Sequence, residues 1–147
     1  RVLGITHPEP GWPSGAVWNF PAGQRGEMLI RVLIRSGFGG AVIGLTDHFS
    51  APFDEQDIFY NLFNFEIGPD GLLPEGAHLR TERWNQLRLR WDCGSGECKV
   101  TLDERTVADL PLLHKVTPGP SYVRLRSTSL RPDSHGMMIA SVMVNVG

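Results

Sequence analysis

The feature that most constrains the fold is a strict alternation of apolar and polar residues over residues 84–103. Successive side chains of a β-strand point to opposite faces, so a period of two predicts a strand with one buried and one solvated face. The alternation is interrupted once, by the turn-forming residues 94–97, and then resumes. This stretch therefore predicts a β-hairpin. Its apolar row consists of Leu87, Leu89, Trp91, Cys93, Cys98, Val100 and Leu102.

One register of this hairpin brings apolar residues opposite apolar ones and opposite charges together. Its pairs are Cys93 with Cys98, Trp91 with Val100, Leu89 with Leu102, Asp92 with Lys99, and Arg88 with Asp103. Cysteines at opposite positions can reach the Cα separation of a disulfide, so we expect a bridge between Cys93 and Cys98. The alternative is a pair of buried free thiols. A zinc site is disfavoured, because C-x4-C without a second ligand pair is a poor zinc-binding pattern. A disulfide in turn favours an exported protein.

Short predicted strands run through the rest of the chain and are separated by Pro and Gly turn signals. They cover residues 16–20, 27–35, 41–46, 58–67, 107–110, 122–127 and 138–146. No stretch has convincing helical periodicity, so the pattern predicts an all-β antiparallel sandwich or barrel. At 147 residues the chain has the size of one domain. Residues 1–15 are expected to form an extended, Pro- and Gly-rich lead-in.

Charge and hydrophobicity exclude several classes of partner. The formal net charge of -2 removes the usual electrostatic argument for nucleic acid or an anionic membrane. No apolar run approaches the roughly 20 residues needed to span a bilayer, and the first residues lack the apolar centre of a signal peptide. The chain begins with Arg1 rather than Met, which is compatible with a mature or excised fragment. We therefore expect neither nucleic acid nor membrane as a partner.

The late strands resemble those of concanavalin A-like jelly rolls, a group that includes laminin G-like, pentraxin and legume-lectin domains. The resemblance rests on the hairpin WNQLRLRWDCGSGECKVTLD, the following VADLPLL, the strand SYVRLRS and a last strand that reaches the C-terminus. It implies an antiparallel β-sandwich of the jelly-roll type. Similar domains accompany the catalytic domains of secreted bacterial sialidases and other glycosidases as lectin-like accessory modules. A secreted, periplasmic or extracellular location is implied with them.

The resemblance also provides a test for catalysis. Glucanases with this fold carry an E-x-D-x-x-E strand motif, which places two carboxylates about 5 Å apart for retaining hydrolysis. The partial match here is Glu55-Gln56-Asp57, and Tyr60 stands where the second glutamate would fall. The segment also lies in a predicted loop beside Pro52. We therefore expect no catalytic residues in this chain.

The predicted carbohydrate-binding residues are Arg88, Arg90, Tyr122, Arg124 and Arg126. All five point outward from their strands, and they form one basic surface if both strands share a sheet. Guanidinium groups bind carboxylates or sulfates through paired hydrogen bonds, and a tyrosine ring can stack on a sugar, so an acidic glycan fits this surface. The alternative is a solvated face on which the arginines pair with nearby carboxylates, each pair contributing about 0–1 kcal/mol.

Other polar residues suggest weaker sites. Asp47, Asp54, Glu55 and Asp57 crowd one loop and offer oxygen ligands for calcium, although their spacing is not that of an EF-hand. No nucleophile motif accompanies His48, and the remaining histidines do not have metal-ligand spacing. The latter are His7, His78, His114 and His135. Trp12 and Trp18 could line a sugar platform, but capping of the core is the commoner use of such tryptophans.

These observations favour a non-catalytic lectin-like domain that binds carbohydrate, with an acidic glycan as the candidate ligand, and works beside the catalytic domain of a secreted glycosidase. The alternative is a structural or interaction module that packs against a neighbouring domain or a copy of itself without binding glycan. A small glycoside hydrolase is the third hypothesis, which the missing carboxylate pair disfavours.

Overall fold

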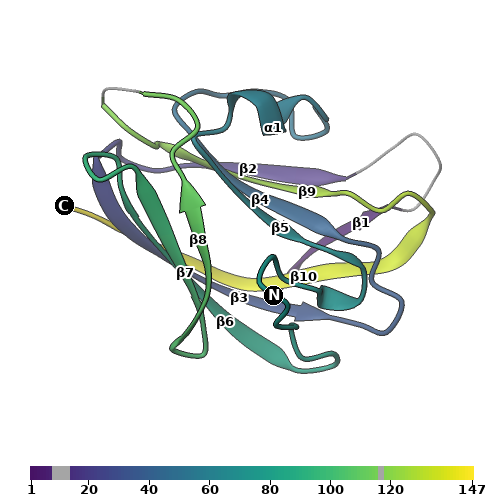
Figure 1. Ribbon diagram of the computed structural model, residues 1–147. Coiled ribbons are helices and arrows are strands. Elements are labelled where there is room, and N and C mark those ends of the chain that lie inside the picture. Colours follow the sequence, from purple (N-terminus) through teal and green to yellow (C-terminus); the bar gives the residue numbers. More distant parts are fainter. Residues whose placement is uncertain (8–13, 116–117) are drawn as a thin grey trace.

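The computed structural model describes residues 1–7, 14–115 and 118–147 and confirms the predicted all-β sandwich. Two antiparallel sheets pack face to face (Figure 1). In the described residues, one sheet has the order β1-β10-β3-β6-β7-β8 and the other β2-β9-β4-β5. The strands are β1 (Leu3–His7), β2 (Gly15–Asn19), β3 (Arg25–Ile34), β4 (Ala41–Thr46), β5 (Phe63–Ile67), β6 (Trp84–Asp92), β7 (Glu97–Leu102), β8 (Arg105–Pro111), β9 (Tyr122–Ser127) and β10 (Asp133–Val146).

The core lies between the sheets and is formed by alternate residues of their facing strands. Trp91 is its largest fully buried side chain, and its indole Nε1 donates a hydrogen bond to the carbonyl oxygen of Gly23 at 3.1 Å. Gly26 of β3 stands opposite Trp91, and a Cβ at this position would lie 2.1 Å from the indole ring. A glycine is therefore required at position 26 for the indole ring to pack against β3.

The predicted β6–β7 hairpin exists, but its predicted register is wrong. Trp91 stands opposite Cys98 rather than Val100, and Arg88 stands opposite Thr101 rather than Asp103. The strands are thus shifted by two residues relative to the prediction. A shift of two keeps every side chain on its face, so the apolar row still points inward, and the alternation alone could not distinguish the two registers.

The turn between the strands determines the actual register. The Asp92 carboxylate accepts hydrogen bonds from the backbone N–H groups of Gly94 (2.8 Å) and Ser95 (3.2 Å). Both bonds lower the pKa of Asp92, and the bond from Ser95 has the larger effect. Gly96 has a φ of 77°, which favours glycine. Together these residues close the hairpin at the pair Asp92 and Glu97.

This register also overturns the predicted disulfide. Cys93 and Cys98 are both free thiols, because Cys98 lies opposite Trp91 and Cys93 has already entered the turn. Burial raises the pKa of Cys98 to about 12 and also raises the pKa of the half-buried Cys93. The cysteines thus serve as small core residues and no longer argue for export.

Two segments differ from the sequence-based prediction. The expected lead-in contains β1, which pairs with β10 through Leu3 and Ile5. The segment predicted as a strand at residues 58–67 divides into the single helical turn α1 (Asp57–Tyr60) and β5. Figure 1 shows α1 on the outer side of the four-stranded sheet. A further 3-10 turn spans Pro69–Gly71.

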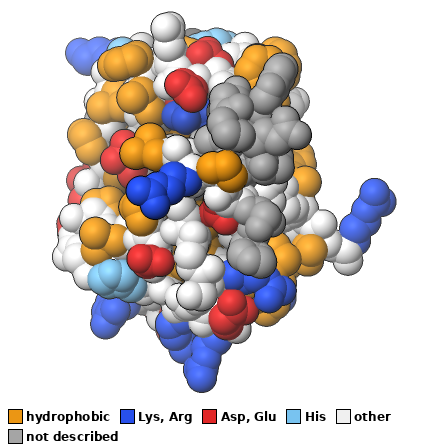
Figure 2. All heavy atoms as spheres, turned by 90° about the vertical axis from the view of Figure 1, so that its right-hand side faces the viewer, with side chains coloured by type: hydrophobic (Ala, Val, Ile, Leu, Met, Phe, Trp, Pro, Cys, Tyr) orange, Lys and Arg blue, Asp and Glu red, His pale blue; other side chains and the backbone are white. Residues whose placement is uncertain are grey.

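The surface of the sandwich carries mixed charges. Figure 2 shows the end of the molecule that lies on the right in Figure 1, where basic and acidic side chains are interspersed with hydrophobic ones. This distribution agrees with the small net charge of -2. Among the described residues, no helix has the length and apolar character needed to cross a membrane.

The state of the cysteines gives the first prediction. We expect iodoacetamide at pH 8 to alkylate Cys93 before Cys98, which should react only when the protein is unfolded, because its thiol is buried and its pKa is about 12. A reductant should leave the thermal denaturation midpoint unchanged. Peptide mass spectrometry of the alkylated protein checks this order, and recovery of an intramolecular disulfide from the unreduced protein would contradict it.

Candidate functional site

The five predicted site residues lie on two different sheets. Arg88 and Arg90 belong to β6 in the six-stranded sheet, whereas Tyr122, Arg124 and Arg126 belong to β9 in the four-stranded sheet. All five point away from the core, so the two groups face opposite sides of the sandwich. The expectation that both strands share a sheet is therefore wrong, and the two groups of residues cannot form one surface.

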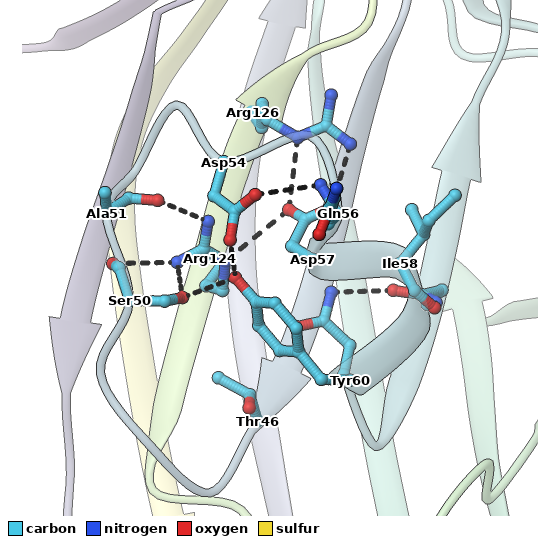
Figure 3. A network of polar contacts seen from close by, with 12 residues as sticks. Thr46, Ser50, Ala51, Asp54, Gln56, Asp57, Ile58, Tyr60, Arg124 and Arg126 are labelled. Carbon is cyan, nitrogen blue, oxygen red and sulfur yellow. Dashed lines mark hydrogen bonds and ion pairs between the residues drawn. The ribbon is translucent and has the colours of Figure 1, made fainter.

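Arg124 and Arg126 are also buried, with only 1% and 5% of their surface exposed. The loop of residues 47–60, which contains α1, lies over them, and its Asp57 is fully buried (Figure 3). Asp57 accepts two hydrogen bonds from Arg126, at 3.1 Å to Nε and 2.8 Å to Nη2, and a longer one of 3.5 Å from Nε of Arg124. One carboxylate thus binds both guanidinium groups.

The other N–H groups of Arg124 bind the same loop. Nη2 donates to the carbonyl oxygen of Ala51 at 2.7 Å, and Nη1 donates to the carbonyl oxygen of Ser50 at 2.8 Å and to its hydroxyl group. Buried charges are tolerated only when they are paired and hydrogen-bonded, and these contacts meet that condition. Arg124 and Arg126 therefore hold the loop on the sheet, and neither is exposed to a ligand.

Tyr60 extends this network towards solvent. Its hydroxyl group lies 2.8 Å from both the hydroxyl oxygen of Ser50 and a carboxylate oxygen of Asp54, and its ring lies beneath the Arg124 guanidinium at 5.8 Å. The hydrogen bond from Tyr60 and one from the backbone N–H of Gln56 lower the pKa of Asp54. Tyr122, the remaining predicted site residue on β9, is half-buried with its ring 6.3 Å from that of Phe49.

Three of the four carboxylates considered for calcium binding have partners within the protein. Asp57 binds the two arginines, Asp54 binds Tyr60, and Asp47 lies 2.7 Å from Nδ1 of His48. Among the described residues, no group of three or more His, Cys, Asp or Glu side chains is arranged to hold a metal ion. Glu55 is exposed whereas Asp57 is buried against arginine, so these two do not resemble a pair of hydrolytic carboxylates.

Arg88 and Arg90 lie on the open outer face of the six-stranded sheet. Glu27 of the neighbouring strand β3 pairs with both, at 3.2 Å to Nη1 of Arg88 and 3.0 Å to Nη2 of Arg90. The two arginine side chains are nevertheless 35% and 65% exposed. Each guanidinium has five N–H donors, so both retain donors that can bind a ligand.

A shallow hollow of about 280 Å³ opens between β6 and β7 at this point. Its lining consists of Arg88, Arg90, Lys99, Thr101 and Glu104. Lys99 stands opposite Arg90 in the hairpin, and its ammonium group is 3.9 Å from Asp109. Three cations thus surround a small open site, an arrangement suited to a carboxylate or sulfate.

Sequence reasoning missed three members of this site. Lys99 and Thr101 alternate with the apolar row of β7, so their outward direction was available from the pattern. Their position beside Arg88 and Arg90 depended on the register, which the alternation left open. Glu27 comes from β3, about sixty residues earlier, and no local pattern predicts its pairing with β6.

Trp18 lines a different kind of hollow. This cavity of about 660 Å³ lies between β2 and β10 and is lined mainly by apolar side chains, including Phe20, Val142 and Val144. Carbohydrate sites require convergent polar groups, and Trp18 here faces few. Trp12 lies outside the described residues. His78 and His114 are exposed, and Nε2 of His114 lies 2.6 Å from the carbonyl oxygen of Phe59.

Comparisons with known proteins address the fold. No protein-family model matches the sequence, and a comparison with curated proteins gives no match either. Among solved structures, a sialidase superposes with a TM-score of 0.77 at 14% identity over 99% of this chain and 15% of the sialidase. Trypanosoma rangeli sialidase, in complex with 2,3-difluorosialic acid, gives 0.59 at 13% identity over 97% of this chain and 25% of the other.

A complete lectin chain is similar as well. CG-16, a homodimeric agglutinin from chicken liver, superposes with a TM-score of 0.58 at 12% identity over 90% of this chain and 100% of its own. The fold is thus a concanavalin A-like jelly roll, as predicted from the hairpin and the late strands. The chain spans 15% and 25% of the two sialidase chains. At these identities the similarity concerns the fold alone.

The buried network gives the second prediction. Asp57→Ala leaves two buried guanidinium groups without their carboxylate, so we expect it to lower the free energy of unfolding by about 3–5 kcal/mol. Glu55→Ala is the matched control, because Glu55 lies in the same loop but is exposed, and a surface change of this kind costs within about 0.5 kcal/mol. Urea denaturation of both variants measures the difference. Equal stability of the two would contradict the structural role of Asp57.

Proposed function

We propose that this chain is a non-catalytic lectin-like domain that binds acidic carbohydrate on the outer face of its six-stranded sheet. The observation that carries the proposal is the adjacent pair of partly exposed guanidinium groups, Arg88 and Arg90, which share the single carboxylate of Glu27. A carboxylate or sulfate of a glycan can bind such groups through paired hydrogen bonds. Tyr122, Arg124 and Arg126 are not part of the proposed site.

The free donors of the arginines support an anionic ligand. Arg88, Arg90 and Lys99 contribute three positive charges around the hollow, and the nearby carboxylates are those of Glu27, Glu104 and Asp109, the last 3.9 Å from Lys99. Arg88 and Arg90 share one carboxylate, so their remaining N–H donors, rather than a net local charge, favour an anionic ligand. Thr101 adds a hydroxyl group that can donate to or accept from a sugar hydroxyl.

The fold supports the proposed context. Two of the similar structures are sialidases, of which this chain matches only a part, and another is an agglutinin. A domain of this kind can hold a substrate glycan near a catalytic domain in the same protein, which is the role that we propose. A neighbouring catalytic domain of an exported glycosidase is the corresponding partner, and an extracellular location goes with it.

An interaction module that does not bind glycan is the second candidate function. Three phenylalanines of the loop of residues 47–60, Phe49, Phe53 and Phe59, are exposed on the opposite side of the molecule from Arg88. Exposed apolar side chains on a loop held by a buried ion pair favour contact with another protein surface. Glycan binding by Arg88 and Arg90 distinguishes the first function from the second.

Calorimetric titration with 3′-sialyllactose and with lactose tests the proposed function. The wild-type protein should bind sialyllactose but not lactose, and binding should weaken as salt is added because the contact is partly exposed. Arg88→Gln combined with Arg90→Gln should lower the affinity at least tenfold, the equivalent of about 1.4 kcal/mol. Arg131→Gln, which changes an exposed arginine outside the site, is the matched control. Binding that survives the double substitution would contradict the proposed site.

Glu27 gives a separate prediction. Its carboxylate occupies donors of Arg88 and Arg90 that the ligand would otherwise use. Glu27→Gln removes this competing charge, so we expect affinity for 3′-sialyllactose to rise on the order of threefold to tenfold at low salt. The same titration measures the change. Weaker binding by Glu27→Gln would mean that the ligand depends on this carboxylate to hold the arginines in position.

A further inference from the structure

We propose that the site accepts an extended oligosaccharide and that Trp84 forms a second subsite for its neutral sugars. This inference rests on the proposed function. The outward residues of β6 form one row, because alternate residues of a strand point to the same face. The row consists of Trp84, Gln86, Arg88, Arg90 and Asp92. At about 3.3 Å per residue, Trp84 and Arg90 lie about 20 Å apart along the strand, which is long enough for several sugar rings.

Three hollows follow this row and share lining residues. The hollow of about 280 Å³ shares Arg88 with a second of about 240 Å³, which is lined also by Gln86. It shares Arg90 with a third of about 590 Å³, which reaches Arg25 and Asn145. The three hollows thus follow the outward row of β6 from Gln86 to Asp92, with Arg88 and Arg90 in the middle, and Trp84 is the next outward residue of that row beyond them.

Trp84 lies at one end of the row, on the outward side of β6. It is 36% exposed, and the guanidinium of Arg31 lies over its ring at 5.5 Å from the centroid. Arg31 lies on the neighbouring strand β3, opposite Gln86. Its cation–π contact holds the indole of Trp84 in place on the sheet surface. An indole combines a large apolar face with a polar N–H, and such a face can pack against the C–H groups of a pyranose.

Gln86 lies between the aromatic and cationic parts of the row. Its exposed side-chain amide offers both a donor and an acceptor, which suits neutral sugar hydroxyls. The order along β6 is therefore an aromatic ring, an amide and then two guanidinium groups. This order matches an oligosaccharide in which an acidic sugar is joined to a chain of neutral sugars, the acidic group on Arg88 and Arg90 and the neutral part on Trp84.

A length series at constant charge tests this inference. Sialic acid, the trisaccharide 3′-sialyllactose and a pentasaccharide, sialyl-lacto-N-tetraose, each carry one carboxylate. We expect the pentasaccharide to bind about fivefold to tenfold more tightly than sialic acid, because only the longer glycan can pack its neutral sugars on the indole face of Trp84. Trp84→Ala should remove this increment and leave the affinity for sialic acid unchanged, whereas Trp84→Tyr should retain part of it. The control is Trp18→Ala, which removes a partly exposed tryptophan on β2 of the opposite sheet.

The outcomes separate the two proposals. Equal affinity for all three sugars, with no effect of Trp84→Ala, would overturn the extended site and leave the Arg88 and Arg90 site intact. A length increment that Trp18→Ala removes would also overturn it, since the neutral sugars would then lie on β2. Absence of binding by all three sugars would overturn the proposed function together with this inference. Circular dichroism of each variant verifies that the sandwich is folded.

Discussion

The buried contact between Asp57 and two arginines governs how this sandwich presents its surfaces. Arg126 binds the carboxylate through two N–H groups and Arg124 through one, all beneath the loop of residues 47–60. The loop is thereby held on the outer face of the four-stranded sheet. Without that carboxylate, two desolvated positive charges would remain under the loop, which is unfavourable by several kcal/mol. The loop and its charge network therefore depend on each other.

This arrangement assigns different roles to arginines that look alike in the sequence. Each of the strands β6 and β9 carries the pattern Arg-Leu-Arg, with the arginines pointing away from the core. On β9 the loop covers them, and their hydrogen bonds are made within the protein. On β6 the two arginines share the partly exposed carboxylate of Glu27, and open space lies beside them. The chemistry that remains available for a ligand thus lies on the six-stranded sheet.

The fold was largely predictable because burial of alternate residues is a local pattern. The bounds of β4 and β9 and the inward row of β6 and β7 follow from it directly. The register of the β6–β7 hairpin does not follow from this pattern, because a shift of two residues leaves every side chain on the same face. The hydrogen bonds that Asp92 accepts in the turn determine the pairing instead. The predicted disulfide depended on that register and was wrong with it.

The candidate site was only half predictable for a related reason. Which strands share a sheet is a long-range property, and no local pattern places β6 and β9 in different sheets. The burial of Arg124 depends on a loop about seventy residues away in the sequence, whose Asp57 was considered as a loop carboxylate that could bind calcium. The exposed alternation on β6, in contrast, was sufficient to predict the direction of Arg88 and Arg90.

Mapping of backbone amide chemical shifts during titration with 3′-sialyllactose tests the central claim most directly, because it locates the ligand without changing any residue. The account predicts that the largest shifts occur at residues 86–90 of β6 and 99–101 of β7, while the loop of residues 47–60 and β9 remain unchanged. Shifts confined to that loop and β9, or no shifts at millimolar ligand, would contradict it.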